Sequence, residues 1–467
     1  MKKVIGLVFI GFLFSGILFA QESKSAESDA KKTETVKLSI EEAVEYALKN
    51  SRTLKSSDID LELKERAAKN SWNVFLPSVT ASGTMKRASE ISPQYAAAGL
   101  DDYPDEESRW DVIGSVSASW NFTPAYIAQI KIAKAQYEAG KISWEKNLRE
   151  TTTNIKKMYY GLLLQQESLK IKKASLENTR QRMNQAATNF KNGSIPELQY
   201  LKAQVDYENA KPDVDSAEQS LNQQMDLFEF MIGMPIGTPI ELTSSIEPNY
   251  VDVTAEELLE KYSDNDLQIQ SLEKNKLAAK LGISALDLST WIPTVSLNYG
   301  WQPMYVDGST MGLPANAKAF GFAGDVGSDE KWYNSGSLSL TLAWNITNML
   351  PWSSNRQKVK DSKQQLRQLD INIETLKEKQ KVDVRKAVDT LNQAREQIDS
   401  MARNVTLAQK AYDMTVRSYR NGTTERLDLR DTESSLDQAK LGLVNQKFQY
   451  ISALMDLENT LNTDLTK

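Results

Sequence analysis

A long pair of heptad-patterned helices in the last quarter of the chain constrains its fold most strongly. Residues 353–419 carry apolar side chains spaced alternately by four and three, and a returning arm repeats a similar pattern. Such a stripe is typical of a helix that supercoils with a neighbour. The stripe comprises Ala387, Leu391, Ala394, Ile398, Met401, Val405, Ala408 and Tyr412 on the first arm, and Leu436, Ala439, Leu443, Tyr450, Ala453 and Leu457 on the second.

The turn between these arms contains Asn421 and Gly422, residue types that tolerate a positive φ and suit the end of a helix. A helix of about 67 residues is roughly 100 Å long at 1.5 Å per residue. Residues 353–461 therefore predict a rod, and not part of a compact globular domain.

The same order of segments occurs twice along the chain, with equivalent motifs about 215 to 229 residues apart. Each copy has a short helix that opens on a capping-box sequence, a second helix, two alternating runs, and a long helical hairpin. We predict a first repeat at 38–233 with its hairpin at 124–233, a linker at 234–253, and a second repeat at 254–467 with its hairpin at 351–463. Pro212 lies within the first return helix and is expected to kink it.

The first twenty residues have the pattern of a signal peptide, with Lys2 and Lys3 before an apolar run that ends at Ala20. A retained membrane anchor is the alternative. Residues 21–37 are rich in Ser, Lys, Glu and Asp and predict a flexible N-terminal segment. Removal of residues 1–20 changes the formal charge from −6 to −8, and an acidic chain with scattered charges does not indicate nucleic-acid binding.

The chain contains no cysteine and no histidine, which excludes disulfides and leaves few metal ligands. We find no nucleotide-binding loop and no nucleophile constellation. The sequence therefore predicts neither an enzyme nor a bound cofactor.

Four alternating runs, at about 76–88, 109–123, 291–304 and 335–347, each have one apolar face and one face of small polar residues. Aromatic residues lie near the ends of the runs. This pattern is typical of transmembrane β-barrel strands, although a soluble antiparallel sheet with one buried face alternates in the same way. Four such runs behind a signal peptide favour the barrel.

Four strands cannot close a barrel, and open sheet edges are not tolerated in lipid. Because the smallest such barrels have about eight strands, at least two and more comfortably three copies of the chain must share one barrel. The predicted fold is mainly α, with a long coiled-coil α-barrel and four transmembrane strands per protomer.

The repeat and its motifs resemble the TolC-like outer membrane efflux protein family over essentially the whole mature chain. The motifs that carry the resemblance lie at 38–43, 76–79, 190–203 and 419–431. The resemblance implies a homotrimer with a twelve-stranded barrel in the outer-membrane lipid of a diderm bacterium and helices in the periplasm. It also implies a passive exit duct of a tripartite efflux or type I secretion system. The partners that the resemblance implies are a periplasmic membrane-fusion adaptor and an inner-membrane pump of RND, ABC or MFS type.

The family narrows its periplasmic entrance with rings of aspartate, and the matching positions here are Asp428 and Asp431. They are three residues apart and share one helix face, so three chains would place six carboxylates near the pore axis and select for cations. The alternative is a pair of solvated carboxylates beside Arg426 and Arg430.

Other positions follow the family pattern in part. The first copy has Gln199 where the second has Asp428. Tyr419 and Thr424 occupy positions where the family often places polar partners that lock the gate, but Thr424 is not the arginine sometimes found there. By the same resemblance, the turns at Asn192-Gly193 and Asn421-Gly422 are the contacts for the adaptor.

A second hypothesis is a periplasmic coiled-coil structural or adaptor protein whose strands form a soluble sheet. A barrel trimer needs detergent for extraction, whereas such a protein does not.

Overall fold

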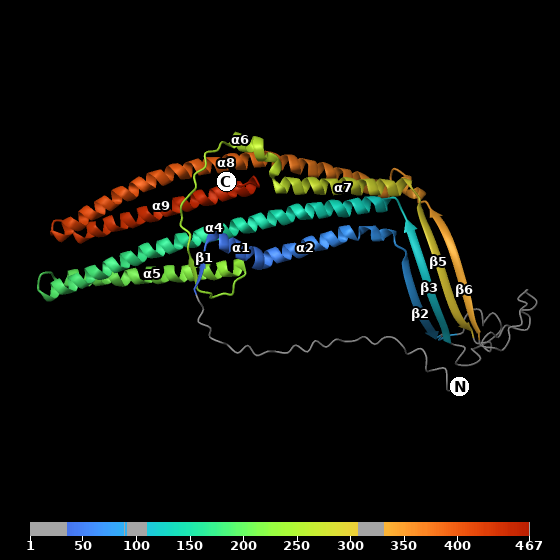
Figure 1. Ribbon diagram of the computed structural model, residues 1–467, viewed down its shortest axis with the longest axis horizontal. Helices are drawn as coiled ribbons and strands as arrows, with labels where there is room; N and C mark the ends of the chain where they lie inside the picture. The colour runs from blue at the N-terminus through green and yellow to red at the C-terminus, as the bar shows by residue number, and fades with distance from the viewer. Residues whose placement is uncertain (1–34, 88, 91–109, 307–330, 467) are drawn as a thin grey trace, which may run out of the picture.

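The computed structural model describes residues 35–87, 89–90, 110–306 and 331–466. The predicted signal peptide, most of the predicted flexible segment and most of both strand-connecting loops lie outside these residues. In Figure 1 the molecule is elongated, with a β-sheet at one end, two helical hairpin tips at the other, and long helices running side by side between them. The first repeat forms one side of this helical layer and the second repeat forms the other.

Each repeat contributes two short helices and one long hairpin. The helices of the first repeat are α1 (Ile40–Asn50), α2 (Arg52–Lys69), the short 3₁₀ segment η1 (Ser71–Phe75), α4 (Ala125–Lys191) and α5 (Glu197–Ile232). The second repeat has α6 (Ala255–Tyr262), η3 (Ser263–Asn265), α7 (Leu267–Trp291), η5 (Ile346–Met349), α8 (Ser354–Arg420) and α9 (Arg426–Thr460). Both α4 and α8 have 67 residues, which is the length expected for the second repeat from its heptad stripe. Helix α5 continues through Pro212, so the proline does not divide it.

Side-chain caps fix the starts of α1 and α6, the first helices of the two repeats. Ser39 caps α1 with a complete capping box, because Glu42 N–H donates to Ser39 Oγ (3.2 Å) and Ser39 N–H donates to Glu42 Oε2 (2.8 Å). At the matching start of α6, Thr254 Oγ1 accepts from Glu257 N–H (3.4 Å). The predicted capping box is therefore complete in the first repeat. In the second repeat, the bond from Glu257 N–H to Thr254 Oγ1 is the part of the box that the structure shows.

The four alternating runs form one antiparallel sheet in the order β2-β3-β5-β6. Its strands are β2 (Ser78–Arg87), β3 (Trp110–Phe122), β5 (Thr294–Val306) and β6 (Lys331–Ala343). Strand β6 ends before Trp344 and Ile346, which the alternation assigned to the strand, because the chain turns there into η5. Strands β2 and β6 are the two edges of the sheet and have no partner on their outer sides within the described chain.

A second sheet lies near the middle of the helices and was not predicted from the sequence. Strand β1 (Val36–Leu38) pairs in parallel with β4 (Ile240–Leu242), which falls in the predicted linker. Tyr159 of α4 is hydrogen-bonded to this sheet and to the residues that follow β4. Its hydroxyl donates to Leu38 O (2.7 Å) and accepts from the N–H groups of Thr243 and Ser244 (both 3.1 Å).

After β4 the linker crosses the helical layer to reach α6, as Figure 1 shows. Val251 N–H donates to the hydroxyl of Tyr450 on α9 (3.0 Å), and Lys447 contacts Glu247 at 2.8 Å. These two contacts fasten the linker to the second repeat, and the pairing of β4 with β1 fastens it to the first.

Two clusters of buried residues are centred one on each repeat, and Ile451 of α9 also belongs to the first. The first gathers around Tyr159, Phe228 and Ile155, and the second around Val384, Tyr450 and Leu457. Leu391, Ala394, Ile398, Leu436, Ala439 and Leu457 of the predicted stripe are all buried, which confirms the heptad pattern as a packing face.

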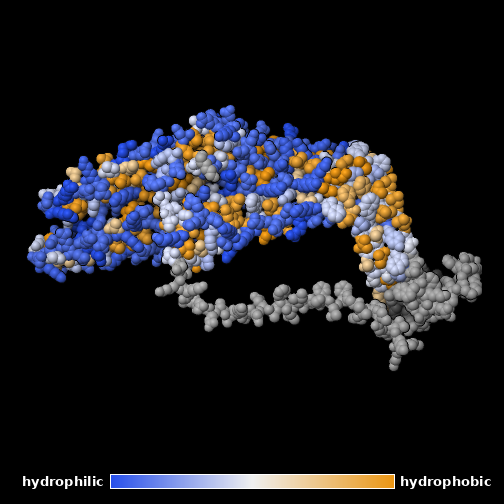
Figure 2. Space-filling model, viewed as in Figure 1, coloured by the Kyte–Doolittle hydropathy of each residue, from blue (hydrophilic) through white to orange (hydrophobic). Residues whose placement is uncertain are grey.

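Hydrophobic residues also gather on the outer surface around the sheet and its junction with the helices, whereas most of the helical surface is hydrophilic (Figure 2). Leu338, Leu340 and Leu342 of β6 are largely exposed, with Leu340 at 73%. Among the described residues, no helix combines the length and apolar character needed to cross a membrane.

Candidate functional site at the hairpin tips

The two hairpin tips have the same backbone turn. In the first, Gly193 adopts φ +69°, Gly193 N–H donates to Phe190 O (2.9 Å), and Ser194 N–H donates to Asn189 O (2.8 Å). In the second, Gly422 adopts φ +73°. Gly422 N–H donates to Tyr419 O and Thr423 N–H donates to Ser418 O, both at 3.0 Å. This is the Schellman arrangement, which needs a left-handed residue after the helix. Glycine alone takes the positive φ, since Asn192 and Asn421 keep φ near −80°.

The order of helices near the tips decides which of them are neighbours. Helix α4 packs against both α5 and α9, and α9 packs against α8, so the order across the layer is α5-α4-α9-α8 (Figure 1). Contacts between the two repeats at this end therefore join the α4/α5 hairpin to α9.

Asp428 and Asp431 lie in the first two turns of α9, and both are exposed. A carboxylate in the first turn of a helix is favoured by the helix dipole. Neither carboxylate takes part in an ion pair among the described residues. Only their backbone carbonyls are engaged, by Thr432 Oγ1 (2.9 Å) and Ser435 Oγ (2.8 Å) respectively.

The remaining predicted gate residues lie close to the tip. Tyr419 and Thr424 are half-buried, and within the described chain neither side-chain hydroxyl bonds to the other hairpin. Gln199, at the position equivalent to Asp428, is exposed, as is Lys202 at the position equivalent to Asp431. The two tips therefore have the same backbone conformation and differ in the charge of their side chains.

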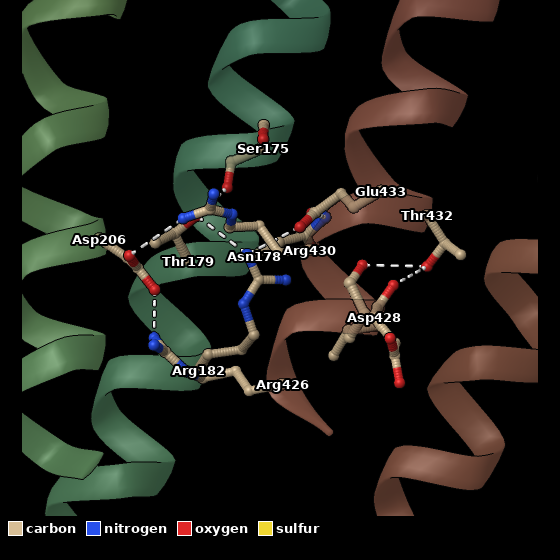
Figure 3. Close-up of polar contacts among 11 residues, drawn as sticks. Ser175, Asn178, Thr179, Arg182, Asp206, Arg426, Asp428, Arg430, Thr432 and Glu433 are labelled. Atoms are coloured by element: carbon tan, nitrogen blue, oxygen red, sulfur yellow. Dashed lines mark hydrogen bonds and ion pairs between the residues drawn. The ribbon is translucent and has the colours of Figure 1, made fainter. Parts of the chain in front are cut away.

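The arginines beside the aspartate pair are drawn toward the other hairpin. Arg426 forms an ion pair with Asp206 of α5, and Arg430 lies 3.8 Å from the other oxygen of the same carboxylate. Asp206 is half-buried, with 27% of its side chain exposed. Figure 3 shows both arginines beside α5 and α4, away from the carboxylate of Asp428. The carboxylates of Asp428 and Asp431 are thus not neutralised by their nearest cations.

A second contact joins the hairpins farther from the tip. Glu433 of α9 occupies a position of the buried stripe, between Leu429 and Leu436, and its side chain is only 6% exposed. Its carboxylate accepts from Arg182 Nη2 (2.7 Å) and Asn178 Nδ2 (2.9 Å), both on α4 (Figure 3). A buried charge needs such partners, because desolvation of an unpaired carboxylate is costly.

Burial and the negative charge of Glu433 raise the pKa of two nearby groups, Asp437 and Tyr412. The pKa of Asp437, one turn along α9, is raised mainly by burial and then by the negative charge of Glu433. Burial, followed by Glu433, also raises the pKa of Tyr412 on α8. The contact region is therefore a partly desolvated cluster that extends across α4, α8 and α9.

The sequence analysis did not identify Asp206, Arg182, Asn178 or Glu433. The signal that could have found the last is a charged residue inside an apolar heptad stripe. The partners lie more than 200 residues away along the chain, and no local pattern points to them.

A comparison with protein families identifies the chain. The model for the outer membrane efflux protein family matches residues 43–233 and 258–463, which are the two repeats. The chain belongs to the outer membrane efflux protein family. No curated protein matches it closely enough to serve as a guide.

Solved structures of outer-membrane channels share this fold at low sequence identity. The Campylobacter jejuni CmeC outer membrane channel has a TM-score of 0.70 and 15% identity, and covers 90% of this chain and 85% of its own. The Vibrio cholerae outer membrane protein VceC has a TM-score of 0.67 and 14% identity, with 91% and 96% covered. The open state of the Neisseria gonorrhoeae MtrE outer membrane channel has a TM-score of 0.68 and 15% identity, with 91% and 89% covered.

The family membership confirms the predicted fold class and function at the level of an outer-membrane efflux channel. It is a passive duct and not an enzyme. Its place is the outer membrane, with the helical part in the periplasm. The alternative of a periplasmic coiled-coil protein with a soluble sheet is not retained.

Proposed function

We propose that three copies of this outer membrane efflux protein form one exit duct, closed at the hairpin tips by Asp428 and Asp431 and opened when the α8/α9 hairpin moves away from α4/α5. The observation that carries the proposal is a four-stranded sheet with two unpaired edges and an exposed apolar face, set at the end of 67-residue helices. Open edges cannot remain in lipid, and three copies supply twelve strands.

The helices support the same assembly. Helices α5 and α8 lie at the outer edges of the tip-side layer, and each exposes apolar residues at helical spacing. On α5 these are Leu198, Leu201 and Val205, and on α8 they are Leu407 and Met414. Exposed stripes on opposite edges are complementary, so α8 of one protomer packs against α5 of the next and closes a cylinder.

The tip geometry supports a gate. Because Arg426 and Arg430 are held by Asp206, the carboxylates of Asp428 and Asp431 keep their negative charge unneutralised. Three protomers would bring six of them together at the entrance, where they exclude anions and favour cations. The contacts of Arg426 with Asp206 and of Glu433 with Arg182 and Asn178 hold the two hairpins together in the closed state. They replace the polar lock expected at Tyr419 and Thr424.

The partners follow from the same proposal. A passive duct takes its energy from elsewhere, so an inner-membrane pump of RND, ABC or MFS type drives export. A periplasmic membrane-fusion adaptor joins the pump to the duct. The exposed turns at Asn192-Gly193 and Asn421-Gly422 are the contacts we assign to the adaptor.

Single-channel recording in planar lipid bilayers tests the gate. Asp428→Ala combined with Asp431→Ala is expected to increase the conductance and to lower the cation-to-anion permeability ratio. Asp413→Ala is the matched control, because Asp413 is an exposed carboxylate on α8 held by Gln409 at 2.9 Å. Wild-type conductance and selectivity in the double variant would remove the gate assignment. A detergent-solubilised particle with the mass of one chain would remove the trimer.

A further inference from the structure

One face of the four-stranded sheet is lined by rows of hydroxyl and amide side chains, interrupted in one row by Gly300. Residues directly opposite each other in an antiparallel sheet point to the same face, so the strand register defines these rows. We call them the hydroxyl rows. They are Asn121-Ser296-Thr341, then Ser78-Ser119-Asn298-Ser339, then Thr80-Ser117-Gly300-Ser337.

Hydrogen bonds between side chains join neighbours within the rows. The hydroxyl oxygens of Ser78 and Ser119 are 2.7 Å apart, as are those of Thr80 and Ser117. The pair Ser82 and Ser115 extends the pattern at 2.7 Å. Each pair uses one hydroxyl hydrogen internally, which leaves a second hydrogen and several lone pairs free. The rows therefore offer both donors and acceptors, and they carry no net charge.

Charged residues are absent from this part of the strands. The sequence has no Asp, Glu, Lys or Arg in residues 78–85, 113–122, 294–303 and 336–343. The charged residues of the four strands, Lys86, Arg87, Asp111 and Lys331, all lie at the strand ends remote from the helices. The helical part of the molecule is different, because helices such as α8 are rich in Lys, Arg, Asp and Glu.

The opposite face of the sheet is apolar. Rows such as Val79-Ala118-Tyr299-Leu338 alternate with the hydroxyl rows, and Leu340 is 73% exposed. In a barrel the apolar face contacts lipid and the other face lines the lumen. The assignment of the hydroxyl rows to a lumen rests on the proposed function.

We infer that the helix-side part of the barrel, over these charge-free ranges, is an electrically neutral, hydroxyl-lined sleeve that selects neither cations nor anions and does not retain apolar cargo. Conduction requires that a solute bind weakly enough to leave. A wall of hydroxyls stays hydrated and offers no apolar patch, so an amphiphilic molecule of either charge passes it without adsorbing. This part of the duct then contributes nothing to selection by charge.

Matched charge substitutions at Ser117 test this inference. Ser117 is exposed and lies in the middle of β3. In bilayers at about 0.1 M salt, where the Debye length is about 10 Å, Ser117→Asp is expected to raise the cation-to-anion permeability ratio about twofold. Ser117→Lys is expected to lower it by a similar factor, because a neutral wall responds equally to both signs. Ser117→Ala removes the hydroxyl without adding charge and should leave the ratio unchanged.

The outcomes separate the inference from the proposed function. No conductance from the wild-type protein contradicts the duct itself. Conductance with no shift in either charged variant, or a shift for one sign only, overturns the neutral sleeve. If the charged variants fail to insert, Ser337→Asp and Ser337→Lys on β6 repeat the test. Failure of these as well, with normal insertion of the Ser117→Ala protein, also overturns it, because the rows would then face lipid.

Discussion

Replacing Arg182 by methionine is expected to open the duct by removing the cation that faces Glu433. The two partners differ in burial, since the Glu433 side chain is 6% exposed and the Arg182 side chain is 21% exposed. Arg182→Met leaves a buried carboxylate with Asn178 as its remaining partner. Removing one partner of a buried ion pair typically costs about 3 kcal/mol, and this cost is relieved when the hairpins separate and water reaches Glu433.

Glu433→Gln should have a smaller effect. The glutamine keeps a carbonyl acceptor for Arg182 and Asn178, and the more exposed guanidinium of Arg182 retains access to water. A loss of about 1 kcal/mol, the size of one ordinary hydrogen bond, is expected. Since 1.4 kcal/mol corresponds to a factor of ten, the ratio of open to closed states should rise by more than about 100-fold in Arg182→Met and by about fivefold in Glu433→Gln.

The open fraction in single-channel recordings measures both effects. The double variant Arg182→Met with Glu433→Met is the control, because replacing both partners of a buried pair by apolar residues is often nearly neutral. It should lie closer to wild type than Arg182→Met alone. Equal effects of Arg182→Met and Glu433→Gln, or a double variant as open as Arg182→Met, would refute the reasoning from burial.

Two further predictions concern stability, measured as the thermal midpoint of the purified protein in detergent. Tyr159→Phe removes one donated and two accepted hydrogen bonds at a fully buried site and should destabilise the mid-height sheet by about 1–3 kcal/mol. Tyr160→Phe, at the half-buried neighbour, should have little effect, and equal midpoints for both variants would contradict this. The pKa of Asp437 is raised by burial and Glu433, so its ionisation costs stability as pH rises from the ordinary value of about 3.9 through the raised one. Asp437→Asn should therefore have a higher thermal midpoint than wild type at pH 7, and the difference should disappear at acidic pH, where Asp437 is protonated. A variant less stable than wild type at pH 7 would contradict this prediction.

The long helices and the sheet were predictable because their patterns are long. A heptad stripe sustained over residues 387–412 fixes a helix and its packing face together, and a glycine at position 422 marks where it ends. The strands followed from alternation over ten or more residues. Strands β1 and β4 have three residues each, which is too short for any period to appear. Their position depends on Tyr159, far along the chain, which hydrogen-bonds to Leu38 of β1 and to Thr243 and Ser244 just after β4.

The candidate site also has one part that the sequence predicted and one part that it did not. The spacing from Gly422 placed Asp428 and Asp431 on one face of a helix end, as the structure has them. That spacing did not reveal the ion pair between Arg426 and Asp206, whose members are 220 residues apart. Cross-repeat contacts depend on how two rods lie against each other, and single-helix periodicity contains no information on that.

Divergence between the repeats fits the proposed gate, because the two hairpins carry different charged groups on the same backbone. The two tips end in the same glycine turn, yet Gln199 and Lys202 of the first repeat stand where the second has Asp428 and Asp431. The first hairpin instead supplies the groups that hold the second, namely Asp206, Asn178 and Arg182. Two hairpins that both carried acids would repel each other at the entrance, and no ion pair would hold one hairpin to the other. In the proposed gate, the first hairpin, which supplies the partners of Arg426 and Glu433, would be the stationary wall, and the second, which carries Asp428 and Asp431, would be the moving element.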